Sequence, residues 1–139
     1  MAYPDVVRNL VETLEQVQGV ASVLAYEPTA IVATPAFYLL LDRAERISKG
    51  GVSGYTYSIL CRLCFNWVDN EQAELEVMQF LNRVAVAIES SGQVQTESSH
   101  GLMALNRVEG VFVIIGGVLY RALDFYVEVT EKGMRRGEV

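Results

Sequence analysis

The strongest constraint on the fold is a regular alternation of apolar and polar side chains near the end of the chain, in residues 116–132. Leu123, Phe125, Val127 and Val129 would share one side of an extended strand, and Asp124, Tyr126, Glu128 and Thr130 the other. A period of two residues is the signature of a strand with one buried face. Gly116-Gly117 follows the apolar run 111–115 and is a two-residue turn signal. The chain is therefore predicted to end in a long β-hairpin whose apolar face must be covered.

Length and composition indicate one globular domain. The chain has 139 residues, of which 51% are hydrophobic and 20% charged, and a chain of this size can bury a sizeable core. We expect a single α+β domain over residues 1–139, frayed at 1–3 and 133–139. No apolar run approaches the length of about 18 to 20 residues that a membrane span needs. The acidic residues Asp5, Glu12 and Glu15 occupy the place of a signal peptide's basic and apolar blocks, so we expect a cytosolic protein without membrane contact.

Two stretches have the apolar spacing of amphipathic helices. The first begins at Tyr3-Pro4-Asp5 and ends at Gly19, with Val7, Leu10, Leu14 and Val17 on one stripe. The second is capped by Asp69 or Asn70 and ends around Ser90-Ser91-Gly92. Its predicted buried stripe contains Val77, Met78, Leu81, Val84, Ala85 and Ile88.

Extended segments are predicted at 20–26, 36–47 and 55–67, and a glycine-rich loop at 48–54 joins the last two into a hairpin. Residues 93–110 are compatible with either a short helix or an edge strand, and a loop of this length is typical of functional or partner-ordered segments. The predicted fold is an α+β sandwich, in which two amphipathic helices pack on one face of an antiparallel sheet of four to five strands.

The chain offers few candidates for chemistry. Cys61 and Cys64 match C-x-x-C in letters, but within a strand they face opposite ways and are predicted to be core residues. His100 is the single histidine and lies in a polar stretch, where a solvated side chain is the simpler interpretation. Asp124 and Glu128 share a strand face, which could form a carboxylate site, but a solvated strand face is the simpler interpretation. We therefore expect no catalytic residues, no metal site and no cofactor.

The order of elements resembles that of the tail terminator, or tail-completion, proteins of long-tailed bacteriophages. The resemblance is carried by the N-terminal helix, the proline-containing segment before Phe37, the hairpin to Trp67, the helix 71–88 and the closing Gly-Gly-Val-Leu-Tyr-Arg-Ala-Leu-Asp-Phe-Tyr-Val-Glu-Val. It covers nearly the whole chain and is one of pattern, without a catalytic signature.

The resemblance implies a structural virion protein. Proteins of this kind form a homo-oligomeric ring, a hexamer, that caps the tail tube, ends its polymerisation and joins the tail to a head-tail connector or neck protein. The ring would be assembled in the host cytoplasm and would reside in the tail or neck of the virion. Double-stranded DNA would pass through the lumen without sequence-specific binding. The net charge of −6 suits such a lumen, since a general nucleic-acid binder normally carries basic excess.

Two alternatives remain open from the sequence. One is a tail-tube or head-completion (neck) subunit, although tube subunits are expected to be more strongly β with one helix. The other is a small ligand-binding or enzymatic α+β domain with a pocket around Arg121, Asp124 and Glu128.

Candidate assembly residues fall into two groups. Charged side chains on strands are the candidates for subunit interfaces, namely Asp42, Arg43, Glu45, Arg46, Arg62, Arg121, Asp124 and Glu128. Arg62 and Arg121 lie among apolar neighbours, so each is expected to have a carboxylate partner. Charge reversal at Arg46 or Arg121 is expected to weaken the oligomer. The candidate assembly loops contribute Lys49, Gly50, Gly51, Gly54 and His100.

Overall fold

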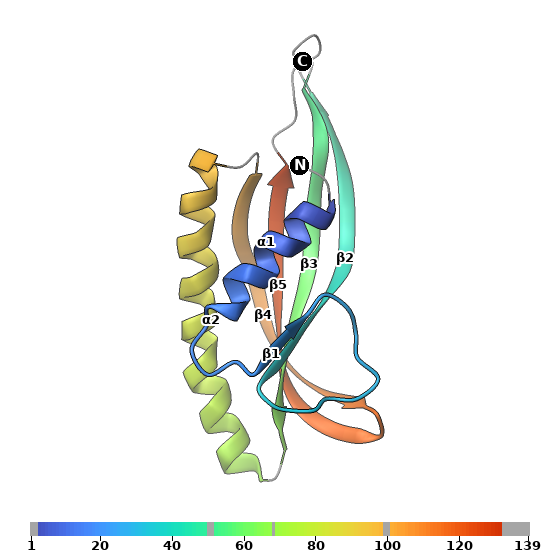
Figure 1. The fold of residues 1–139 in the computed structure, drawn as a ribbon, viewed down its shortest axis with the longest axis vertical. Coiled ribbons are helices and arrows are strands. Elements are labelled where there is room, and N and C mark those ends of the chain that lie inside the picture. Colours follow the sequence, from blue (N-terminus) through green and yellow to red (C-terminus); the bar gives the residue numbers. More distant parts are fainter. Residues whose placement is uncertain (1–2, 50–51, 68, 99–100, 132–139) are drawn as a thin grey trace.

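The computed structural model describes residues 3–49, 52–67, 69–98 and 101–131, with side chains for 3–46, 54–67, 69–90 and 103–130. Two helices and five strands make an α+β domain, as the sequence predicts (Figure 1). The elements are α1 Tyr3–Glu15, β1 Ser22–Leu24, β2 Ala36–Lys49, β3 Val52–Asn66, α2 Asn70–Ser98, β4 Gly101–Ile115 and β5 Val118–Glu131.

The five strands form one mixed sheet in the order β1-β2-β3-β5-β4. The pairs β2–β3, β3–β5 and β4–β5 are antiparallel, with Leu63 opposite Leu123 in the central pair. The short strand β1 instead runs parallel to β2, with Val23 opposite Phe37. The prediction of a wholly antiparallel sheet is therefore wrong at this strand. The connector 25–35 carries the chain back along the sheet before β2 begins, as a parallel pair requires.

Both helices pack on the same face of the sheet, as predicted (Figure 1). Apolar side chains of α1 and α2 meet the inward side chains of β3 and β5 in one continuous core. Its fully enclosed members include Leu10, Leu14, Ile59, Phe65, Val84, Ile88, Phe125 and Val127. In α2 the buried stripe differs from the predicted one, because Phe80 is buried whereas Met78 and Leu81 are exposed.

A second, smaller apolar cluster lies on the opposite face of the sheet. It is formed by Tyr38, Cys64, Ile115, Tyr120 and Ala122, and Leu24 and Ile31 pack against it. The connector 25–35 also meets the turn between β4 and β5. Gly116 has a φ of 59°, and a Cβ there would lie 2.7 Å from the Thr29 carbonyl oxygen, so this position requires glycine. Gly117 also has positive φ, which confirms the predicted Gly-Gly hairpin turn.

Three predicted boundaries are wrong because regular structure extends further than the sequence signals. Strands β2 and β3 continue to Lys49 and from Val52, so most of the predicted loop 48–54 is strand. Helix α2 passes through Ser90-Ser91-Gly92 and ends at Ser98, since a single glycine costs a helix only about 1 kcal/mol. The segment 93–110, for which the sequence allows either a short helix or an edge strand, contains both: residues 93–98 end α2, and residues 101–110 belong to the edge strand β4.

The sheet carries two bulges at the same level. The register of β2 shifts between Leu41 and Arg43, and that of β4 shifts between Leu105 and Arg107. Both shifts flank the paired residues Ile59 and Val127 of the central strands. Bulges increase local twist and bend a strand, so the sheet is bent where the helix-side core is fully enclosed.

A matched pair of valine substitutions tests which residues the core depends on. Val127 is fully buried, whereas Val32 in the connector is fully exposed. We expect Val127→Ala to lower the free energy of unfolding by about 2 kcal/mol, since two methyl groups leave a packed site and a cavity remains. Val32→Ala should change it by less than about 0.5 kcal/mol. Urea denaturation at one fixed protein concentration measures both, and equal effects would contradict the assigned core.

Candidate assembly surface

The face of the sheet away from the helices gathers most of the predicted interface residues. We call it the open face. Across β2, β3 and β5 the register aligns Arg43 with Ser58 and Glu128, and Tyr38 with Arg62 and Asp124. Leu40, Leu60 and Tyr126 form the row between them and are half-buried. In the described part of the chain, the side chains known to pack onto this face from outside the four long strands are Leu24 and Ile31, near the small cluster.

An ion pair between Arg62 and Asp124 lies at the centre of the open face. Nε of Arg62 donates to Oδ1 of Asp124 at 2.6 Å, and Nη2 donates to Oδ2 at 2.8 Å. The third donor, Nη1, reaches the Tyr38 hydroxyl oxygen at 3.0 Å. The side chains are 20% and 2% exposed respectively. This two-pronged geometry is the strongest form of an arginine–carboxylate contact, and it confirms the expected carboxylate partner of Arg62.

The hydrogen bonds of this centre favour the charged form of Arg62. The hydrogen bond to Asp124 raises the pKa of the Arg62 guanidinium further above its already high value. Burial raises the pKa of Tyr38, opposed by the hydrogen bond from Arg62. The Asp124 carboxylate is thus engaged by a permanent cation, and the pair's donors and acceptors are directed at each other.

The β2 side of the open face carries more exposed charges. Nε of Arg43 lies 3.3 Å from Oε1 of Glu45, and both side chains are mostly exposed. The hydroxyl of Ser58 donates to Oδ2 of Asp42 at 3.0 Å. Glu128 is half-buried beside Ser58 in the register. These four predicted residues therefore lie around one half of the open face.

Arg121 and Arg46 lie on the other, helix-covered side of the sheet. Nε of Arg121 contacts Oε1 of Glu74 at 2.8 Å, which gives Arg121 its expected carboxylate partner. Its Nη1 donates to the Val111 carbonyl oxygen at 3.1 Å, and the guanidinium lies 4.8 Å from the centre of the Phe112 ring. Arg46 pairs with Tyr55 in the register and is exposed. The structure thus separates these two arginines from the other six candidates.

Sequence reasoning missed one charged group on the open face. The guanidinium of Arg107 lies 4.2 Å from the centre of the Tyr126 ring, and its Nε lies 3.4 Å from Oε1 of Glu109. Arg107 and Glu109 fall in the segment 93–110, which the sequence left undecided between helix and strand. The alternation Arg107, Glu109, Val111 was the available signal.

Most of the predicted assembly-loop residues cannot be placed at a site. Gly50, Gly51 and His100 lie outside the described residues, and only the backbone of Lys49 is described, at the end of β2. Gly54 is part of β3, opposite Ile47, and not of a loop.

The cysteines occupy opposite faces of β3, as predicted. Cys61 belongs to the helix-side core and Cys64 to the small cluster, and both are free thiols. Burial raises the pKa of the Cys61 thiol, and burial raises that of Cys64 to about 12. Both thiols are therefore protonated at neutral pH, whereas the thiolate is the nucleophile and metal ligand.

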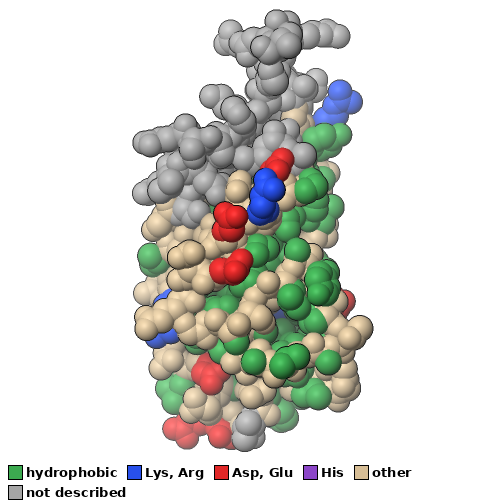
Figure 2. Space-filling view, viewed as in Figure 1, with side chains coloured by type: hydrophobic (Ala, Val, Ile, Leu, Met, Phe, Trp, Pro, Cys, Tyr) green, Lys and Arg blue, Asp and Glu red, His purple; other side chains and the backbone are tan. Residues whose placement is uncertain are grey.

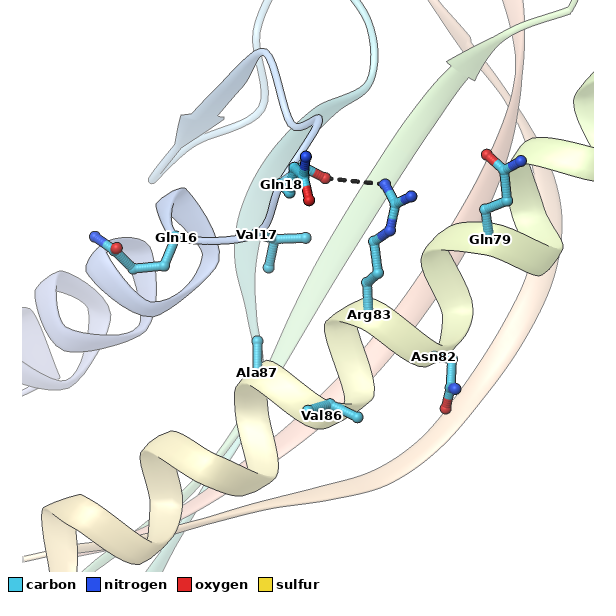
Figure 3. A pocket seen from close by; sticks show the side chains of 8 residues that line it. All are labelled: Gln16, Val17, Gln18, Gln79, Asn82, Arg83, Val86 and Ala87. Carbon is cyan, nitrogen blue, oxygen red and sulfur yellow. Dashed lines mark hydrogen bonds between the residues drawn. The ribbon is translucent and has the colours of Figure 1, made fainter.

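A shallow hollow of about 460 Å³ lies between the turn after α1 and the middle of α2 (Figure 3). Its polar lining consists of three glutamines, one asparagine and one arginine: Gln16, Gln18, Gln79, Asn82 and Arg83. Nη1 of Arg83 donates to the Gln18 carbonyl oxygen at 3.2 Å and so links the two elements. A second hollow of about 190 Å³ between β1 and the connector is lined mainly by apolar residues. Arg121, Asp124 and Glu128 line neither hollow.

Among the residues that the structure describes, no three His, Cys, Asp or Glu side chains are grouped closely enough to hold a metal ion. Within the same residues, neither helix combines the length and the apolar content that crossing a membrane would take.

Comparison with known proteins adds no relative. No protein-family model matches the chain, and no curated protein matches it.

The central ion pair makes a testable contribution to stability. We expect Asp124→Leu or Arg62→Met alone to lower the free energy of unfolding by about 3 kcal/mol, because each leaves a buried group without its partner. The double variant should recover much of this loss, since no charge is left unpaired. Leucine at Glu45, in the exposed Arg43–Glu45 pair, should cost less than about 1 kcal/mol. Denaturant titrations of the four variants give the coupling, and strictly additive losses would contradict it.

The buried thiols make stability depend on alkaline pH. Because the pKa of Cys64 is about 12 in the folded protein and about 8.5 in an unfolded chain, the unfolded state loses its proton first. The contribution of the buried Cys64 thiol to the free energy of unfolding is therefore complete below about pH 8.5, and it declines as pH rises from there towards 12. Between pH 7.5 and 9.5, the wild type should lose about 1 kcal/mol more than Cys64→Ala. Denaturant titrations at both values measure this, and parallel losses would show that Cys64 is not protected.

Proposed function

We propose that the protein is a structural subunit that closes into a hexameric ring, caps a phage tail tube, ends its polymerisation and joins the tail to the head. In this proposal the ring contacts the tail-tube protein on one side and a connector or neck protein on the other. DNA passes through its lumen, and the subunit is not an enzyme. The resemblance in element order suggests the class of protein.

The observation that carries the proposal is the amount of large apolar surface that one copy leaves exposed. Exposed hydrophobic side chains occur on β2, α2, the connector and the β4–β5 hairpin, and include Leu41, Met78, Val32, Phe112 and Ile114. Figure 2 shows hydrophobic side chains gathered over the lower and right-hand parts of one face. Apolar side chains gathered on a surface mark interaction sites more often than scattered ones do, so we take them to favour a subunit of an assembly over a solitary domain.

The charged residues support the same proposal. The pairs Arg62–Asp124 and Arg121–Glu74 form within one copy. These four charged groups therefore stabilise the sheet and its contact with α2, and they have little capacity left to bind an ion or a substrate. The net charge of −6 disfavours tight contact with DNA phosphates, as a lumen that DNA traverses requires.

Two other roles are alternatives to the capping ring. A tail-tube or neck subunit would share the apolar contact surface, but two helices on one sheet fit a capping ring better than a strongly β tube subunit. A ligand-binding or enzymatic domain would need a pocket near Arg121, Asp124 and Glu128, and these residues line neither of the hollows described above.

The mass and the shape of the purified protein test the proposal. We expect light scattering to give six times the 15.4 kDa mass of one chain, and negative-stain micrographs to show closed rings. Added to polymerising tail-tube protein, the rings should stop elongation and mark one end of each tube. Growth of the protein itself into long tubes would favour the tube subunit. A monodisperse monomer that leaves tube length unchanged would overturn the proposal.

A further inference from the structure

The connector 25–35 is held to the sheet mainly at its two ends. The pairing of β1 with β2 keeps these ends on neighbouring strands. Among the described residues, the backbone hydrogen bonds outside helices and strands include one at the connector, from the Ala21 amide to the Pro35 carbonyl oxygen at 2.7 Å. Between the ends, Tyr26 and Val32 are largely exposed. A segment with few hydrogen bonds and few buried side chains is the kind that opens while the rest of a protein stays folded.

The connector also packs incompletely on the strands beneath it. The hollow of about 190 Å³ lies between the connector and the first residues of β2, and its lining includes Pro28, Ile31, Phe37 and Tyr38. Side chains that border a hollow make fewer close contacts than side chains in a packed core. The connector therefore gains less from lying on the sheet than a fully packed segment would.

The small cluster lies under the connector. Ile31 packs against this cluster and is only partly buried, whereas Cys64 within it is fully enclosed. Burial is the largest cause of the raised pKa of Cys64, and the nearby Glu27 carboxylate of the connector raises this pKa further. Ile31 and Glu27 thus place the connector over Cys64.

The connector closes against the turn between β4 and β5, and the two lie side by side in Figure 1. A Cβ at Gly116 would lie 2.7 Å from the Thr29 carbonyl oxygen and 3.5 Å from the Cβ of Ala30. Gly117 also has a positive φ, of 78°, but a Cβ there would meet nothing within 4 Å. The turn can therefore be altered with or without displacing the connector.

We propose that the connector is a flap, which closes against the β4–β5 turn and opens while the helices and the strands stay folded. It has the length of an Ω-loop, and its ends lie on neighbouring strands as in such loops. Opening lifts Ile31 and Glu27 from the small cluster and makes Cys64 accessible. The open face thereby gains an apolar surface that the closed flap covers. The inference concerns a single copy and does not depend on the ring.

The two native cysteines report flap opening and its control in one experiment. Cys64 lies under the flap, whereas Cys61 lies in the helix-side core. The purified chain is treated with iodoacetamide at about pH 8, where an exposed thiol is partly ionised. Mass spectrometry of tryptic peptides reads the two thiols separately, because trypsin cleaves after Arg62 between them.

We expect Cys64 to react at least about tenfold faster than Cys61, because only Cys64 is exposed by a local opening. Each rate is referred to the rate of the same thiol in the urea-unfolded chain. Equal rates, or a faster reaction of Cys61, would overturn the flap. Low urea concentrations add a check, since the rate at Cys64 should rise less steeply with urea than the rate at Cys61, as expected when little surface is exposed.

Two substitutions within the connector test whether this segment controls access to the thiol. Ile31→Ala removes a side chain that holds the flap on the small cluster, so the rate at Cys64 should rise about fivefold and the rate at Cys61 should stay the same. Val32→Ala changes a fully exposed side chain of the same segment and should alter neither rate. An unchanged rate at Cys64 in Ile31→Ala, or an equal rise at both thiols, would overturn the proposal.

A matched pair of glycine substitutions tests where the flap closes. Gly116→Ala and Gly117→Ala both put a side chain at positive φ and strain the turn, but only Gly116→Ala drives a methyl group against Thr29. We expect the rate at Cys64 to be about tenfold higher in Gly116→Ala than in Gly117→Ala, while the rates at Cys61 match. Equal rates at Cys64 in the two variants would overturn closure of the flap against this turn.

Discussion

The pairing of β3 with β5 is the constraint on which the rest of the structure depends. These strands occupy the middle of the sheet, and both of their faces are used. The residues in register with Cys61 and Leu63, namely Phe125 and Leu123, face the helices, while Cys64 and Ala122 face the small cluster. Burial on both faces demands one register, since a slip of one residue would exchange the two sets of side chains. The helices, the connector and the outer strands are all placed relative to this pair.

The Arg62–Asp124 ion pair makes that register costly to change. It sits directly across the central strands with both charges largely removed from water. A buried pair of this kind contributes little net stability compared with well-packed apolar residues. Its consequence is specificity, because a one-residue slip of either strand would carry its charged group, the guanidinium or the carboxylate, into the helix-side core without its partner. The half-covered open face can therefore stay ordered without a helix to pack against it.

The local spacing of apolar residues predicted the helices and strands that bury one face, because burial of one face imposes that spacing on the element's own sequence. The alternation in 55–67 and 121–130 and the helical stripe from Val77 to Ile88 are each visible within a short window of sequence. Three features had no such local signal. The parallel direction of β1 depends on the path of the connector, and the passage of α2 through Gly92 is decided only weakly by helix propensity. The third is the undecided segment, most of which forms the edge strand β4. For the site, the sequence predicted that Arg62 and Arg121 have carboxylate partners, but their identities, Asp124 and Glu74, follow from the register and from the position of α2.

The remaining apolar surface is where this chain departs from a self-sufficient domain. Charged side chains and bulges on β2 and β4, at the two long edges of the sheet, disfavour pairing with another sheet. The ion pairs of Arg62 and Arg121 form within one copy. Each helix buries one face in the core. The outer side of α2 and the end of the β4–β5 hairpin keep large hydrophobic side chains in water. Met78 shows the conflict most directly, since its spacing fits a buried stripe while the core is already filled by Phe80. An extra apolar position on a helix whose inner face is complete adds nothing to the folding of one copy, and its free energy becomes available only when a second surface covers it.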